Sequence, residues 1–197
     1  MALSSPNRMV WALFRSLRRT VSGLSRIDDT TEQKDQVAVA VILAVAAVES
    51  FFNLYFRTLV ETTHKEHTSM VLEDLDPKDG SRPKGLKYKL RHWPCKVLGR
   101  SFKWQKGVAH DFDCLRERRN SLMHFTSSYQ ERQLPGFQVG GLANTDCYDE
   151  LQPKHAEEAL RLAEGMLEET FRLTGVVKDQ IPYDLHGWTG KPSGTSS

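Results

Sequence analysis

The pattern of apolar and polar positions along the 197-residue chain predicts helices for most of its length. A segment from about Glu32 to Thr62 is apolar on every side at its centre, which is typical of a helix buried between other helices. Further helices are predicted at about 7–25, 86–91, 104–125 and 153–173 from apolar periodicity and from capping or breaking residues. Because no convincing run of strands is present, we predict an all-α bundle of about five helices.

Turn-forming and charged residues divide the chain into three parts. We expect residues 1–29 to form a basic N-terminal helix, residues 30–175 to form the bundle, and residues 176–197 to form an extended tail with a disordered end. Residues 65–84 are rich in charge and contain proline and glycine, so they are predicted to be a loop. Residues 126–152 also lack a helical period, and a connection of this length is often a binding loop or a lid.

Composition narrows the class of protein. A hydrophobic fraction of 39% is ordinary for a globular protein, and a net charge of +2 does not by itself indicate a nucleic-acid binder. Three cysteines are too few and too sparse for a secreted disulfide framework, so we expect a reducing, cytoplasmic location. Residues 1–26 hold five arginines and no acid, which fits a targeting segment or, as we favour, a basic amphipathic helix. The apolar run Val37–Val48 is too short to span a bilayer, so no membrane partner is expected.

Two pairs of histidine and cysteine have spacings that a zinc site could use. His92 and Cys95 form the first pair, and His110 and Cys114 form the second. No Cys-x-x-Cys sequence accompanies them, and the second pair is predicted to face solvent. We therefore expect neither a metal nor another cofactor.

One arginine occupies a position where the helical pattern requires an apolar residue. On the wheel of the 104–125 helix, Arg119 falls within the apolar stripe of Val108, Phe112, Leu115 and Leu122. A core-facing guanidinium is costly unless it is paired, and Glu49 is the only charged residue within the apolar centre of the long helix. We therefore predict an ion pair between Glu49 and Arg119. Its loss in an Arg119→Ala variant would cost about 3–5 kcal/mol.

The same helix carries the sequence Arg119-Asn120-Ser121-Leu122-Met123-His124, which places an arginine and a histidine close together. Histidine moves protons near neutral pH, and the fork of an arginine matches phosphate oxygens. Asn120 and His124 lie one turn apart, beside Arg119. A purely architectural role for Arg119 is the alternative.

In this arrangement the motif resembles that of the HEPN family (the higher eukaryote and prokaryote nucleotide-binding domain). The resemblance extends to Glu49-Ser50-Phe51-Phe52-Asn53, which is similar to the family's acidic residue followed one turn later by asparagine. It covers roughly residues 30–175. It implies a dimer in which two motifs face each other, with Arg119, Asn120 and His124 as catalytic residues. The tyrosine that many toxin members carry two places after the histidine is replaced by Thr126, so regulation by its modification is not supported.

Many members of this family are metal-independent endoribonucleases, and others are silent modules that bind nucleic acid or protein. We expect an endoribonuclease of the toxin or defence type, with RNA as substrate, and the resemblance leaves room for an antitoxin or a regulatory protein as partner. His124→Ala should then abolish cleavage and leave the fold intact. The residues expected to bind RNA are Arg116, Arg118, Lys103 and Lys106. The homodimer contact is expected near Met123 and Phe125.

The charge around His124 is the feature that separates the two functions. A basic groove lined by Arg116, Arg118 and Arg119 would favour the nuclease, and an acidic groove would favour the binding module. The acid-free stretch 84–106 leaves two interpretations open as well. It either holds a phosphate backbone, or it is a solvated basic face whose aromatic residues anchor it to the core: Trp93, Phe102 and Trp104.

Overall fold

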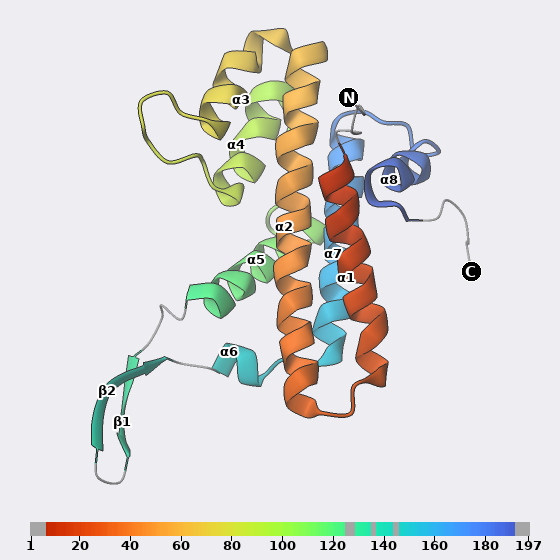
Figure 1. Cartoon of the computed structure of the whole chain (residues 1–197). Coiled ribbons are helices and arrows are strands. Elements are labelled where there is room, and N and C mark those ends of the chain that lie inside the picture. The colour runs from red at the N-terminus through yellow and green to blue at the C-terminus, as the bar shows by residue number, and fades with distance from the viewer. Residues whose placement is uncertain (1–6, 125–128, 135–136, 144–145, 192–197) are drawn as a thin grey trace, which may run out of the picture.

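The computed structural model describes residues 7–124, 129–134, 137–143 and 146–191, with side chains for 7–123 and 146–191. These residues form eight α-helices, two short 3₁₀ turns and one β-hairpin, joined by loops (Figure 1). In chain order the helices are α1 (Arg8–Gly23), α2 (Thr30–Thr62), α3 (Thr68–Leu75), α4 (Leu86–Leu98), α5 (Val108–His124), α6 (Asp146–Asp149), α7 (Pro153–Leu173) and α8 (Ile181–Thr189). The strands are β1 (Tyr129–Leu134) and β2 (Phe137–Ala143), and the 3₁₀ turns are Leu24–Arg26 and Lys65–His67. The helical class predicted from sequence is confirmed.

Helix α2 runs through the centre of the bundle, as its apolar composition predicts. Figure 1 shows α1 and α7 along one side of α2, and α3, α4 and α5 on the other. The helix begins at a side-chain cap, where the Asp29 carboxylate accepts a hydrogen bond of 2.7 Å from the Glu32 amide. Its buried side chains include Phe51, Phe52 and Phe56, which contact helices on both sides.

By length and composition α2 could also cross a membrane, and it is the one helix of the described residues for which this holds. The predicted apolar run was shorter because it stopped at Glu49, whereas the helix continues through further apolar residues. Half of its most apolar window is buried inside the bundle, and the core helix of a soluble protein passes the same test. The absence of a membrane partner therefore stays a prediction.

The N-terminal helix belongs to the bundle, although we expected a separate element before residue 30. Val10, Phe14 and Leu17 of α1 are buried in the same core as the aromatic residues of α2. Met9, by contrast, is exposed. Since α1 and α2 are joined by a short turn, they pack as an antiparallel pair along their lengths (Figure 1).

The C-terminal segment is helical, so our expectation of an extended tail was wrong. Helix α8 buries Ile181, Leu185 and Thr189, which lie four residues apart and so share one face. The helix ends at Gly190, which has a left-handed φ of 69°. This periodicity was present in the sequence, but the segment is too short to be stable without the α1 and α7 surfaces that cover it. The expected disorder falls on residues 192–197, outside the described residues.

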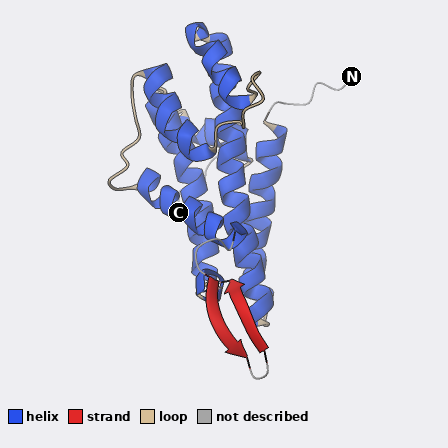
Figure 2. Cartoon of the chain, turned by 90° about the vertical axis from the view of Figure 1, so that its left-hand side faces the viewer, coloured by secondary structure: helices blue, strands red, loops and turns tan. Residues whose placement is uncertain are grey.

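The segment expected to be a long loop contains a β-hairpin instead. Strands β1 and β2 pair antiparallel, with Tyr129 opposite Ala143 and Leu134 opposite Phe137. Figure 2 shows the hairpin projecting from one end of the helical body. Pairing satisfies backbone groups that a long irregular connection would leave to water. Helix α3 likewise occupies part of the predicted loop 65–84. With α3, α6 and α8 added, the described residues have more helices than the five or so we predicted.

Candidate functional site

Helix α5 carries the predicted motif and packs between α2 and α7. Phe112 and Leu115 are buried on its inner face, as the helical wheel predicts, whereas Val108 and Leu122 of the predicted stripe are half-buried and Ala109 is buried in addition. The close approach of α5 to α7 favours a glycine, because a Cβ atom on Gly165 would lie 3.0 Å from Cγ1 of Val108 and would press on that side chain. The motif therefore lies on a helix that is fixed by close packing.

Arg116 lies in an ion network between α4 and α5. Its side chain is 9% exposed, and its Nε donates a hydrogen bond of 2.9 Å to the Asp113 carboxylate. It also pairs with Glu117. From α4, Arg91 lies 3.2 Å from Asp113, and Lys87 lies 3.4 Å from Glu117. Three cations are thus matched by two carboxylates, which ties the two helices together.

The protonation of this network follows from its contacts. Burial raises the pKa of Asp113, but hydrogen bonds and charges from Arg116 and Arg91 outweigh it, so the pKa lies below its ordinary value. The pKa of Glu117 is lowered, chiefly by its hydrogen bond with Arg116. Both groups are therefore charged at neutral pH and hold Arg116. Asp113 and Glu117 already bind the Arg116 guanidinium, so RNA would have to compete with them, and the RNA-binding role of Arg116 stays a prediction.

Arg119 has very different surroundings, although it lies one turn further along α5. It is half-buried, and its Nη1 donates a hydrogen bond of 3.1 Å to the side-chain oxygen of Asn120. Its Nε is buried and has no hydrogen-bond partner within the described part of the chain. No ion pair between Arg119 and a carboxylate is present among those residues either. Arg119 is thus a partly desolvated cation that no acid of the described residues neutralises.

The predicted ion pair between Glu49 and Arg119 is absent from the described residues. Glu49 instead lies 4.0 Å from Nζ of Lys89 on α4. Lys89 is 3% exposed, and it donates a hydrogen bond of 2.8 Å to Asn53, one turn after Glu49. Burial lowers the pKa of Lys89, and the charges of Glu49 and Asp74 oppose that shift. The prediction failed because α4, a third helix, supplies the cation that faces this part of α2.

A buried polar chain continues from Lys89 into α3. Nζ of Lys89 lies 5.5 Å from the centre of the Trp93 ring. The indole of Trp93 donates a hydrogen bond of 2.8 Å to Asp74, which is itself buried. Sequence reasoning missed this chain, because Lys89 looked like one member of a solvated basic stretch. The only available signal was its spacing of four residues from Trp93, which lies beyond the predicted helix 86–91 but within α4.

Arg118 lies where α5 meets α6 and the start of α7. It is half-buried, and its backbone carbonyl accepts a weak hydrogen bond of 3.9 Å from the Cys147 thiol. Burial lowers the pKa of His155, and the charges of Arg118 and then Lys154 lower it further. The His155 Nδ1 accepts a hydrogen bond of 3.1 Å from the Gln152 amide, which fixes the ring at the start of α7. The cations beside the motif thus include Lys154 of α7, which the sequence did not indicate, and the lowered pKa of His155 favours its neutral ring.

The remaining predicted site residues are placed as follows. Lys103 and Lys106 are exposed in the segment before α5. Trp93 and Phe102 are buried, so the core-anchor interpretation of residues 84–106 is confirmed for these two. His124 is the last residue of α5, and its side chain lies outside the described residues, as does the whole of Phe125. Thr126, which stands at the position of the family's modified tyrosine, also lies outside the described residues.

The histidine–cysteine pairs do not gather further ligands. His110 and Cys114 lie one turn apart, with 4.0 Å between Nε2 and Sγ. His92 stacks on Tyr88, with ring centres 4.1 Å apart. Within the ranges that the structure describes, no three histidine, cysteine or acidic side chains come close enough to hold a metal ion.

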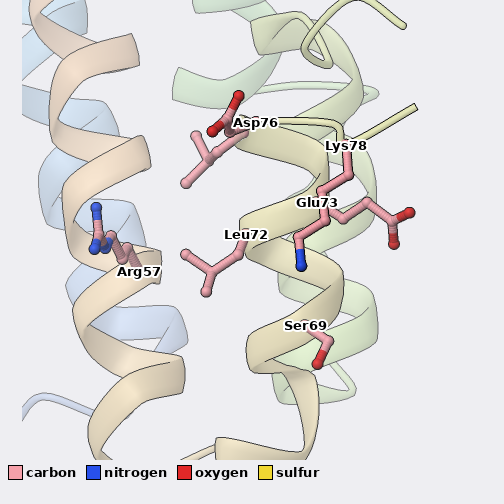
Figure 3. A pocket seen from close by; sticks show the side chains of 7 residues that line it. Arg57, Ser69, Leu72, Glu73, Asp76 and Lys78 are labelled. Carbon is pink, nitrogen blue, oxygen red and sulfur yellow. The ribbon is translucent and has the colours of Figure 1, made fainter. Parts of the chain in front are cut away.

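A separate hollow of about 560 Å³ lies between α2 and α3 (Figure 3). Arg57 of α2 faces Leu72 of α3 across it, and charges of both signs surround this apolar residue: Glu73, Asp76 and Lys78. The Arg57 guanidinium is already paired with Glu61 at 3.0 Å. No residue of α5 lines this hollow, so it does not belong to the motif.

Comparisons of the chain with protein-family models, with curated proteins and with solved structures found no match. Its function is therefore inferred from the chemistry of the residues on α5 and their neighbours.

Proposed function

We propose that this protein is a HEPN-like, metal-independent endoribonuclease of the cytoplasm, with Arg119, Asn120 and His124 as its catalytic residues. The observation that carries the proposal is the state of Arg119. A half-buried guanidinium without a carboxylate partner among the described residues is poised to accept an anion, and phosphate matches its fork. The three cysteines are free thiols, as a reducing compartment requires.

The proposed reaction needs a base, an acid and a positive charge, which two copies of the motif would supply together. The 2′-oxygen of one nucleotide forms a bond to the adjacent phosphorus, and the bond from phosphorus to the 5′-oxygen breaks. The proton of the 2′-hydroxyl passes to a base, and an acid gives a proton to the leaving 5′-oxygen. His124 serves this proton transfer, Arg119 stabilises the phosphorane charge, and Asn120 holds the guanidinium in place. The products are a 2′,3′-cyclic phosphate and a 5′-hydroxyl.

One motif supplies a single histidine, whereas the reaction uses a base and an acid. We therefore propose a homodimer in which two motifs face each other. Met123, beside the motif, is 46% exposed, which suits a contact with a second copy. Sedimentation velocity at micromolar concentration is expected to give the mass of a dimer. A monomer at all such concentrations would contradict the proposal of two facing motifs.

The cleavage assay uses the purified protein and a single-stranded RNA in the presence of EDTA. We expect cleavage that leaves a 2′,3′-cyclic phosphate, because the attacking oxygen comes from the RNA itself. The matched substrate is the same oligonucleotide with one 2′-deoxynucleotide at the cleavage site, which should resist cleavage there. A protein with both Arg119→Met and His124→Ala, purified in the same way, controls for contaminating nuclease.

Two results would contradict the endoribonuclease proposal. The first is equal activity of the wild type and the double variant, which would assign the cleavage to a contaminant. The second is no cleavage by the wild type across RNAs of varied sequence and structure. Either result would favour the second function considered below.

A catalytically silent module that binds nucleic acid or protein is the second candidate. The observation that favours it is the neutralisation of Arg116 by Asp113 and Glu117, which removes one of the three arginines expected to line a basic groove. Helix α6, which packs beside α5, adds the acidic residues Asp146 and Asp149, and Glu150 follows directly after it. An antitoxin or a regulatory protein with a basic surface would suit such a face.

A further inference from the structure

The exposed face of α1 carries a line of arginines. Arg8, Arg15 and Arg19 are all exposed, and on an ideal helix their directions span about 40°. Arg26 follows, also exposed, in the 3₁₀ turn after α1. The sequence contains no acid before Asp28, so nothing within this segment offsets the positive charge.

These arginines have no carboxylate partner among the residues that the structure describes. Arg18, on a neighbouring face of the same helix, shows the contrast, because it lies 2.9 Å from Glu164 and donates to the Thr189 carbonyl. Glu164 also pairs with Lys191 at 2.7 Å. Glu164 of α7 is therefore already neutralised by Arg18 and Lys191. It does not offset the positive charge of Arg8, Arg15 and Arg19.

An aromatic ring lies beside this line, in a hollow of about 450 Å³. Trp11 forms part of its lining, together with Arg8 and Arg15 on either side. The indole is 39% exposed and is held in place, because its Nε1 donates a hydrogen bond of 3.0 Å to the Gly187 carbonyl. Two guanidinium groups and a fixed aromatic ring together match a phosphate backbone and a stacked base.

We infer that this surface, defined by Arg8, Trp11, Arg15 and Arg19 and called the arginine face below, binds the backbone of single-stranded RNA. The choice of RNA rests on the proposed function, whereas the choice of a polyanion rests on the charge alone. Figure 1 shows α1 and α5 on different sides of α2, so the arginine face is separate from the motif. It is a second contact for the substrate and takes no part in bond cleavage.

A bilayer with anionic lipids is the competing polyanionic surface, and the packing of α1 argues against it. An amphipathic helix binds a membrane by inserting its apolar side. The apolar side of α1 is formed by Val10, Phe14 and Leu17, which are buried in the bundle. The residues that remain exposed are three arginines and two serines, with Met9 and Trp11 as the two apolar ones, and this mainly polar surface suits a hydrated, flexible chain of phosphates.

The test measures fluorescence anisotropy of a labelled single-stranded RNA with protein that carries His124→Ala, so that binding is read without cleavage. The variant Arg8→Gln, Arg15→Gln and Arg19→Gln is expected to bind about tenfold more weakly, and its slope of log K against log salt should fall by about 2. The matched control replaces three exposed arginines that are already ion-paired, Arg57, Arg161 and Arg172, by glutamine. It removes the same charge and should bind within about twofold of the parent, because its arginines are not free to meet phosphates. Circular dichroism confirms that each protein is folded.

Each outcome supports or overturns the inference. Equal losses in the two triple variants would mean that net charge alone governs binding, and no loss in the first variant would mean that RNA does not use this face. Vesicles containing phosphatidylserine form the second arm. If the first variant loses vesicle binding and keeps RNA binding, the arginine face is a membrane surface and the inference is wrong. Failure of the proposed endoribonuclease function gives a different result. In that case RNA binding would still depend on the arginine face, and the wild-type protein would not cleave the RNA.

Discussion

Replacing Arg119 by methionine is expected to reduce RNA cleavage about a hundredfold to a thousandfold, because it removes the group that we propose as the donor to the phosphorane. The free energy of unfolding should change by less than about 1 kcal/mol. No carboxylate of the described residues loses its partner, since Glu49 is paired with Lys89. The substitution also removes the buried Nε of Arg119, which has no hydrogen-bond partner among the described residues. Steady-state cleavage and urea unfolding measure the two quantities on one preparation.

Arg116→Met is the matched control, because it makes the same change one turn earlier on the same helix. It should lower the free energy of unfolding by about 2 kcal/mol, since Asp113 loses a charged hydrogen bond in a half-buried site. Its effect on cleavage should be smaller than that of Arg119→Met. If Arg119→Met instead costs several kcal/mol and Arg116→Met costs nothing, the architectural role belongs to Arg119.

Replacing Lys89 by alanine is expected to lower the free energy of unfolding by about 3 kcal/mol, the largest stability effect that we predict for a charged residue. The change leaves Asn53 without its donor and Glu49 without its cation, and it removes a buried side chain that covers Trp93. Lys87→Ala, two residues earlier on α4, makes the same substitution in an exposed pair with Glu117. It should cost less than about 1 kcal/mol in the same urea titration.

The pH dependence of this effect has a definite sign. Burial lowers the pKa of Lys89 in the folded state, so the unfolded chain binds this proton more tightly. The free energy of unfolding therefore rises with pH between the Lys89 pKa of the folded state and that of the unfolded state. This gain is lost as the pH falls through the folded-state pKa. The gap in unfolding free energy between wild type and Lys89→Ala should widen from pH 8 towards about 10.4, the ordinary pKa of lysine. A constant gap would mean that the Lys89 pKa is not lowered by folding.

The sequence determined the main helices, because their signals are local. The cap at Asp29 and the proline at the start of α7 mark where helices begin, whatever lies around them. The apolar centre of α2 required neighbours on both sides, and the structure supplies them. The contact between Arg119 and Asn120 is local too, since the two residues are adjacent on α5.

The tertiary structure decided which charges meet. A helical wheel shows that Glu49 and Arg119 are unusual, but it holds no information on which other helix approaches each of them. Helix α4 brings Lys89 to Glu49 and brings Lys87 and Arg91 to the carboxylates that hold Arg116, so Arg119 is left without an acid among the described residues. Partner choice depends on the packing of separate segments, because the free energy of an ion pair depends on distance and burial, which one segment alone does not define.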